Sequence, residues 1–188
     1  MNVVPASLRN GRPPVGPESI RELVFGVEDG VVQNLTLIAG MVGGGLSSAV
    51  IVFAGAVNAI AGVLSMSMGT YLSSKAEQDV AAAVANGHAP FEQATPGRDA
   101  AVMAGAYAVG AFVPILPFAL SFLDRPVSLG LAVVLALLTL FILGYGKAVV
   151  SHQRRVRSGM EMLVLASAAG LLGFLLGALA RGVFGLDV

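Results

Sequence analysis

The chain contains no cysteine and no tryptophan, and only 12% of its 188 residues are charged. Without cysteine it forms no disulfides and offers no thiolate to a metal, so any metal is bound by oxygen, imidazole or thioether groups. A soluble domain carries about a quarter charged residues, so the low charge excludes a soluble enzyme. Motifs for binding ATP or dinucleotides are also missing, which excludes ATP-driven pumping by this chain alone.

The first 20 residues lack the apolar core of a signal peptide, since they hold four prolines and two arginines. We therefore expect residues 1–20 to form a cytoplasmic tail, and the segment that follows to act as its own insertion signal. The remainder, residues 21–188, is expected to be one transmembrane domain.

The residues that are abundant are apolar. Hydrophobic residues make up 56% of the chain, there are 24 glycines, and mean hydropathy is +0.83. Five apolar segments of about 20 residues or more match a hydrocarbon core of roughly 30 Å. The sequence therefore predicts an all-α integral membrane protein with five transmembrane helices, near residues 22–44, 48–72, 100–122, 127–149 and 160–181.

The connections between these segments are short. The sequences GGGLSS and LDRPVS predict tight turns, because glycine and proline interrupt helices. The longest connection, residues 73–99, is expected to be a cytoplasmic linker whose alanine-rich start prolongs the second helix toward Asn86. Two faces of small residues, Gly40 with Gly44 and Gly170 with Gly177, predict close helix contacts, either within one chain or across a dimer.

The distribution of basic residues predicts the orientation. With the N-terminus in the cytoplasm, nine lysines and arginines are cytoplasmic and only Arg125 and Arg181 lie outside. Five spans then place the C-terminus on the opposite side. The basic run at Arg154 has an alternative use, binding anionic lipid or nucleic acid, but we favour its role in topology and expect no nucleic-acid partner.

Polar side chains inside the first two spans are the candidate functional site. Charged groups are costly within a membrane, so Glu28 and Asp29 in the first span indicate function. Asp29, Gln33 and Thr36 share one helical face. In the second span the candidate ligands are Asn58, Met66 and Met68, although an amide also joins helices and methionine also serves packing. Carboxylates combined with a thioether favour a softer transition metal such as Fe²⁺.

Two stretches carry a resemblance to the vacuolar iron transporter family. Residues 21–32, RELVFGVEDGVV, resemble its R-x-x-[VI]-[FL]-G-x-x-D-G-[LIV]-[VI] pattern, and residues 61–74 resemble A-G-A-x-S-M-A-x-G-E-[YF]-x-S. Residues 110–118 are similar to its proline-containing third helix. The resemblance implies a homodimeric five-helix transporter that moves Fe²⁺, with Mn²⁺ as a second candidate, out of the cytosol in exchange for protons. It also implies that Asp29 and Met66 line the pathway.

The sequence departs from that pattern at two places. Thr70 stands where the family has a glutamate, and Glu28 stands where an asparagine is usual, so Glu28 is expected to replace the missing acid. Plant-type members carry a glutamate-rich insertion after the second span. Here the linker offers only a few acids, of which Glu77 and Asp79 are candidates for capturing metal. Glu161 is either a third candidate for capturing metal or an interfacial charge beside Arg157.

The sequence thus predicts a multi-pass transporter of divalent metal and protons, with no tightly bound cofactor and no enzymatic activity. A bias toward alanine, valine, glycine and arginine suggests a bacterial plasma membrane. Two alternatives remain open: a membrane scaffold or assembly subunit that transports nothing, and a proton-coupled carrier of another small solute.

Overall fold

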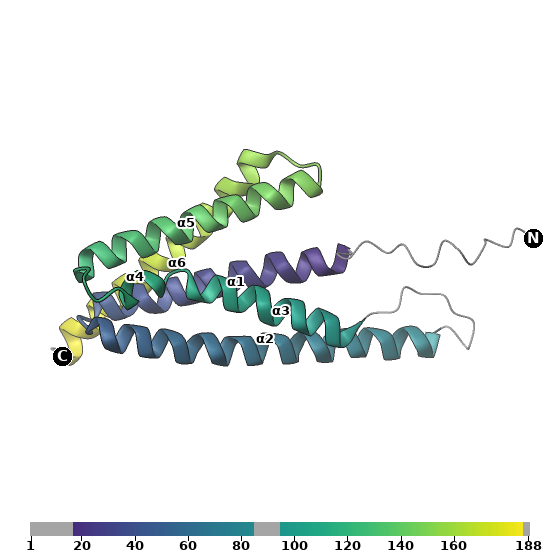
Figure 1. The fold of residues 1–188 in the computed structure, drawn as a ribbon, viewed down its shortest axis with the longest axis horizontal. Coiled ribbons are helices and arrows are strands. Elements are labelled where there is room, and N and C mark those ends of the chain that lie inside the picture. Colours follow the sequence, from purple (N-terminus) through teal and green to yellow (C-terminus); the bar gives the residue numbers. More distant parts are fainter. Residues whose placement is uncertain (1–16, 85–94, 186–188) are drawn as a thin grey trace, which may run out of the picture.

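The computed structural model describes residues 17–84 and 95–185, and all regular elements in these ranges are helices (Figure 1). Most of the expected N-terminal tail and the middle of the expected linker lie outside the described residues. The predicted all-α class is confirmed. The helices are α1 (Pro17–Gly43), α2 (Ser48–Val84), α3 (Pro96–Phe112), α4 (Leu116–Ala119), α5 (Arg125–Val150) and α6 (Arg155–Phe184).

Three helices, α2, α5 and α6, are long and apolar enough to cross a membrane. The chain is therefore an integral membrane protein. Helix α1 is less apolar, because it contains four acids and two amides within its length, and α3 has only 17 residues. The count of five spans accordingly stays a prediction. The helix predicted over residues 48–72 continues through the alanine-rich start of the linker to Val84, which confirms the expected extension.

The third predicted span, residues 100–122, is not one helix. Helix α3 starts earlier, at Pro96, and ends at Phe112, and α4 starts at Leu116. Pro114 lies between them, and a proline lacks the backbone N–H and its ring clashes with the preceding helical turn. The chain instead makes short turns, in which Val113 N donates to Gly110 O and Ile115 N donates to Phe112 O. The two predicted tight turns, before α2 and before α5, are confirmed.

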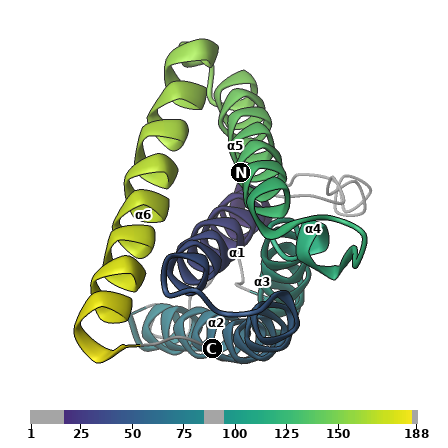
Figure 2. The same ribbon diagram turned by 90° about the vertical axis from the view of Figure 1, so that its left-hand side faces the viewer.

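Helix α1 lies in the middle of the bundle, with α2, α3, α5 and α6 around it (Figure 2). Buried apolar side chains fill the space on both sides of it. One cluster includes Val31 of α1, Leu140 of α5 and Ala166 of α6. The other includes Ile38 of α1, Tyr107 of α3 and Ile115. The most polar of the long helices is thus surrounded by the apolar ones.

Glycines allow α1 to approach two neighbours at backbone distance. A Cβ atom on Gly30 would overlap the carbonyl oxygen of Tyr107, and one on Gly110 would overlap that of Val27, so α1 and α3 touch along their backbones. At the other end of α1, a Cβ on Gly177 of α6 would overlap the carbonyl oxygen of Gly40. The predicted small-residue contacts therefore form within one chain.

This packing predicts that glycines on one helix respond differently to the same substitution. Gly110→Ala places its methyl group against the backbone of α1, where neither side can yield, and should destabilise the fold by on the order of 1–3 kcal/mol. Gly105→Ala on the same helix meets nothing within 4 Å and should be neutral or stabilising. Because the chain has no tryptophan, thermal unfolding in detergent is best followed by circular dichroism. Equal midpoints for the two variants would contradict the α1–α3 contact.

Candidate metal site

A cavity of about 620 Å³ opens between α1, α2 and α3, toward the end of the bundle where α1 begins. Carboxylate, hydroxyl and thioether groups share its wall, which is uncommon inside an apolar helical bundle. Its lining residues are Arg21, Glu22 and Phe25 from α1, Ser65, Met66, Gly69, Thr70 and Ser73 from α2, and Met103 from α3.

Glu22 supplies the carboxylate of this cavity. The residue is only 4% exposed, and the Arg21 guanidinium donates to its Oε1 atom from Nη2 at 2.7 Å and from Nε at 3.1 Å. That hydrogen bond is the main reason why the pKa of Arg21 is raised, and the negative charges of Glu77 and Asp99 raise it further. Two further acids, Glu77 and Asp99, thus lie near enough to Arg21 to act on its charge, although neither lines the cavity.

Asp29 continues the polar face of α1 beyond the cavity. It follows Glu22 by seven residues, which on a helix is two turns, or about 10 Å along the axis, on the same face. The residue is half-buried and lies close enough to Tyr107 for its charge to act on the phenol. Glu22, Met66 and Asp29 therefore belong to one polar region that extends along α1 into the bundle.

Hydrogen bonds between side chains join the three helices just beyond Asp29. The Tyr107 hydroxyl donates to Oε1 of Gln33, and Gly62 makes room for the phenol, because a Cβ there would overlap the tyrosine oxygen. One turn further along α2 and α3, the amide of Asn34 joins all three helices. Nδ2 of Asn58 donates to Oδ1 of Asn34 at 3.0 Å, and Nδ2 of Asn34 donates to the Ala111 carbonyl at 3.1 Å. These amides close the polar region at its inner end.

The predicted site residues divide between the cavity and other surfaces. Met66 lines the cavity, and Asp29 does not line it but lies two helical turns beyond Glu22 on the same face of α1. Asn58 joins α2 to α1 through its amide, which is the helix-packing alternative. Glu28 is half-buried, but it lies about 100° around α1 from Asp29 and does not line the cavity. Met68 is 65% exposed and lies on the far side of α2 from Met66.

The three residues proposed to capture metal lie outside the cavity. Glu77 and Asp79 are exposed near the end of α2. Of the two, Glu77 lies near enough to Arg21, which lines the cavity, for its negative charge to raise the pKa of that arginine. Glu161 accepts a hydrogen bond from Nε of Arg157 at 3.1 Å, and both side chains are mostly exposed, which agrees with the interfacial interpretation.

Three residues of this region were missing from the sequence prediction. Glu22 stands at the start of the predicted span, where a charge is commonplace, yet its spacing of seven from Asp29 placed both acids on one face. Asn34 and Tyr107 carried no such signal. Thr70, at the position of the missing family glutamate, lines the same cavity as Glu22. Glu28 does not line that cavity.

The chemistry of this region suits a cation that is loosely held. Within residues 17–84 and 95–185 there is no group of three or more histidine, cysteine, aspartate or glutamate side chains able to hold a metal. One chain thus offers single carboxylates with a thioether and hydroxyls. Such a donor set is weaker than a structural metal site, and a transported ion must also be able to leave.

The comparison with known proteins agrees with these features. The sequence profile of the VIT family matches residues 20–89 and 82–178, so nearly the whole described chain is covered. Vacuolar iron transporter 1 of Arabidopsis thaliana is 27% identical, with 85% of each chain covered. Vacuolar iron transporter 1 of Eucalyptus grandis is 25% identical, with 84% of each covered. Vacuolar iron transporter homolog 3 of Arabidopsis thaliana is 28% identical over 77% of this chain and 74% of the relative.

Two details of these matches concern chain length and extent. The alignment with the first Arabidopsis protein spans 215 positions, more than the 188 residues of this chain, so that relative contains residues with no counterpart here. The profile matches in two segments that overlap at residues 82–89. On the extent of these matches, the chain belongs to the VIT family.

Proposed function

We propose that the chain transports divalent transition-metal ions, with Fe²⁺ as the principal cargo and Mn²⁺ as a second, and that it is not an enzyme. The observation that supports this most is the cavity in which the buried Glu22 carboxylate and the Met66 thioether share one wall inside a membrane bundle. A carboxylate with a thioether favours a borderline metal over Mg²⁺ or Ca²⁺. The relatives named as iron transporters support iron as the cargo.

The proposed direction is out of the cytosol. The end of the bundle that bears the cavity also carries most of the basic residues, so the positive-inside rule places it, with the N-terminus, in the cytoplasm. The C-terminus then lies on the opposite side, with α1 and the α3–α4 pair as the fourth and fifth crossings. Cytosolic metal would enter the cavity, reach Glu22 and Met66, and move on to Asp29.

Proton exchange follows from the ligands. A carboxylate binds a metal ion only when it is deprotonated, so loading metal at Glu22 and Asp29 releases any proton they hold. Protons arriving from the other side would displace the metal and reset the site. A proton gradient can thus drive transport without an ATP site, in agreement with the absence of nucleotide motifs in the sequence.

The active form is proposed to be a homodimer. Part of α1 is not covered by the other helices, since Gln33 is exposed and Phe25 is 52% exposed. A carboxylate and an amide facing lipid would be costly. A second copy related by a two-fold axis along this face would cover them and bring the two Asp29 residues toward each other. It would also double the carboxylates available to one ion.

The membrane is proposed from composition to be a bacterial plasma membrane, whereas the relatives are named for the vacuole. Two other functions compete with this proposal: a scaffold that transports nothing, and a proton-coupled carrier of another solute. Purified protein in liposomes, loaded with a pH-sensitive dye and exposed to different metals, distinguishes them. A scaffold would show no metal-dependent proton flux, and another carrier would show flux with its solute only.

Asp29→Asn tests the carboxylate exchange. Asparagine keeps the volume and removes the charge that both metal and proton need, so the protein should fold and its metal-driven proton flux should fall to the level of empty liposomes. Glu28→Gln, next to it but away from the cavity, is the matched control and should retain most of the flux. Undiminished flux in Asp29→Asn would refute the mechanism, and an equal loss in both variants would mean that Glu28 shares the role.

The two methionines of α2 provide a second test. Met66→Leu keeps an apolar side chain of similar volume at the cavity wall but removes the thioether, so the preference for Fe²⁺ over harder ions such as Mg²⁺ should fall several-fold. Met68→Leu makes the same chemical change on the exposed side of the helix and should leave selectivity unchanged. Competition between metals for transport in liposomes measures both. Identical selectivity in the two variants would exclude Met66 as a ligand.

The proposed dimer is tested by cross-linking, since the chain has no cysteine of its own. A single cysteine at Gln33 should form a disulfide-linked dimer in membranes when an oxidant is added. A cysteine at Leu138, which is 53% exposed on α5, should not. Cross-linking at Leu138 alone would place the interface on another face of the bundle.

A further inference from the structure

The turn that joins α5 to α6 gathers basic side chains at the end of the bundle where α1 begins (Figure 1). All of these side chains are exposed, and the proposed metal pathway uses none of them. Residues 147–161 contain four cations and a single acid, which are Lys147, Arg154, Arg155, Arg157 and Glu161. The basic run that the sequence assigns to topology is thus also a positively charged surface of the folded protein.

The backbone of this turn has a defined shape. The amide nitrogen of Gln153 donates to the Ala148 carbonyl oxygen at 3.0 Å, which closes the end of α5. His152 has φ of +54°, a left-handed conformation that histidine adopts more readily than most residues with a side chain. The two helices also approach closely, because a Cβ on Gly144 would lie only 2.8 Å from the Ser158 carbonyl oxygen. The basic side chains therefore leave from a fixed position.

One of these arginines is held in place by an aromatic ring. The Cζ atom of Arg155 lies 5.9 Å from the centre of the Tyr145 ring. The centre of the Phe141 ring lies 6.4 Å from that of Tyr145, and Phe141 in turn packs against Gly159 of α6. An arginine stacked on a ring uses the face of its guanidinium, while its N–H donors point outward in the plane. Arg155 is thus already oriented to bind an anion, and its planar fork suits a phosphate.

Apolar side chains adjoin the cations of this turn. Val150, at the end of α5, and Val156, in the first turn of α6, are both more than half exposed. Valines and arginines alternate here at the end of two membrane helices, where a bilayer changes from acyl chains to headgroups. A surface that is basic and apolar at once is typical of protein segments that lie in this interfacial layer. A lipid covers both kinds of side chain, whereas a nucleic acid or an inorganic anion covers only the cations.

The positive charge is confined to one side of this end of the bundle. One of the four cations is balanced locally, because Nε of Arg157 donates to Oε1 of Glu161 at 3.1 Å. The end of α2 carries more acid than base, with Lys75 beside Glu77 and Asp79. Figures 1 and 2 show α2 on the opposite side of the bundle from the α5–α6 turn. An anionic partner is therefore attracted to the turn and not to the whole end of the bundle.

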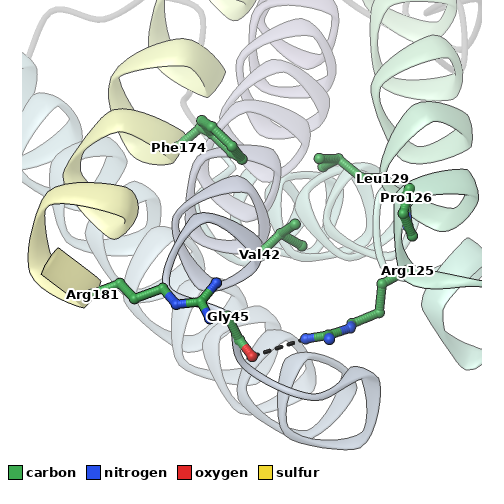
Figure 3. A pocket seen from close by; sticks show the side chains of 7 residues that line it. All are labelled: Val42, Gly45, Arg125, Pro126, Leu129, Phe174 and Arg181. Atoms are coloured by element: carbon green, nitrogen blue, oxygen red, sulfur yellow. Dashed lines mark hydrogen bonds between the residues drawn. The ribbon is translucent and has the colours of Figure 1, made fainter. Parts of the chain in front are cut away.

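The basic residues at the opposite end of the bundle show a different use of arginine. A cavity of about 540 Å³ at that end is lined by Arg125, Arg181 and mostly apolar side chains. Nη1 of Arg125 donates to the carbonyl oxygens of Gly45 at 2.8 Å and Leu46 at 3.0 Å (Figure 3). These bonds fasten α5 to the turn between α1 and α2, so Arg125 serves the fold. Positive charge alone therefore does not indicate a lipid site, and the tyrosine and valines distinguish the α5–α6 turn.

We propose that the α5–α6 turn binds the headgroup of an anionic phospholipid in the leaflet at its end of the bundle. The phosphate binds to the guanidinium groups of Arg154 and Arg155, and Val150 and Val156 contact the glycerol and the start of the acyl chains. Cations at the membrane surface attract anionic lipid. This role is compatible with topology, since the positive-inside rule acts during insertion and the lipid binds afterwards. The proposal does not depend on which cargo the protein carries.

Native mass spectrometry of the full chain tests this proposal. The protein, purified in detergent, is mixed with equal amounts of phosphatidylglycerol and phosphatidylcholine of the same acyl chains. Wild type should retain phosphatidylglycerol in preference to phosphatidylcholine. Arg155→Gln removes the stacked cation and should reduce this preference about fivefold. Arg154→Gln combined with Arg155→Gln should reduce it by on the order of twentyfold.

Matched variants separate this site from a general effect of charge. Lys75→Gln removes one exposed cation from the end of α2 and should leave the preference unchanged. Tyr145→Leu keeps every charge but removes the ring beneath Arg155, so it should reduce the preference about two- to fivefold, whereas Tyr145→Phe should not. Equal retention of the two lipids by wild type, or equal effects of Arg155→Gln and Lys75→Gln, would overturn the proposal. An unchanged preference in Tyr145→Leu would do the same, because the stacked arginine would then have no part in it.

Two further outcomes would assign the turn to another occupant. Inorganic phosphate that stabilises wild type against heat as strongly as phosphatidylglycerol, but not Arg155→Gln, would mean that the arginines bind a free anion. A fluorescent single-stranded oligonucleotide whose anisotropy rises with wild type and not with Arg155→Gln would mean that they bind nucleic acid. Either result would refute the lipid site, and we expect neither, because both ligands leave Val150 and Val156 uncovered.

Discussion

The backbone contact of α1 with its neighbours is the constraint on which the rest of the structure depends. Helix α1 carries Glu22, Glu28 and Asp29 within its length, and a helix with so many acids is a poor membrane span by itself. It is held in the bundle because Gly30 and Gly110 let it touch α3, and Gly40 and Gly177 let it touch α6. In a membrane such contacts replace the hydrophobic effect as the force between helices. The carboxylates reach the interior because these glycines bring their helix there.

The polar side chains of the bundle fall into two groups that differ in their hydrogen-bond partners. Asn34 is fully buried and bonds to both Asn58 and the Ala111 carbonyl, so its polar atoms are occupied by protein. Glu22, by contrast, is bonded to a side chain that is itself mostly exposed, and its cavity is open at one end. Fully satisfied amides give the three helices one fixed arrangement. Glu22 is itself only 4% exposed, so its carboxylate faces the cavity and its exposed arginine partner.

Much of the fold was readable from the sequence, because span length and turn residues act locally. The positions of α1, α5 and α6 and the turns before α2 and α5 follow from apolar runs ended by glycine or proline. The break at Pro114 was missed because hydropathy alone continues through it. For the site, charge and sulfur within apolar spans single out Asp29 and Met66 as candidates, and these stay predictions. The same reasoning also selects Asn58 and Met68, since a sequence does not reveal which amide finds a partner or which side of α2 faces its neighbours.

The two cavities differ because their ends of the bundle are closed in different ways. Where α1 begins, α6 is not packed on its polar face, so acids and a thioether remain open toward the solvent. Where α1 ends, Gly40 and Gly43 bring α6 onto that same face, and the space left between α5 and α6 is apolar. Because α6 meets α1 at Gly40 and Gly43, the same helical face carries acids near its beginning and backbone contacts near its end. These glycines therefore decide how far along α1 the polar face stays uncovered by α6.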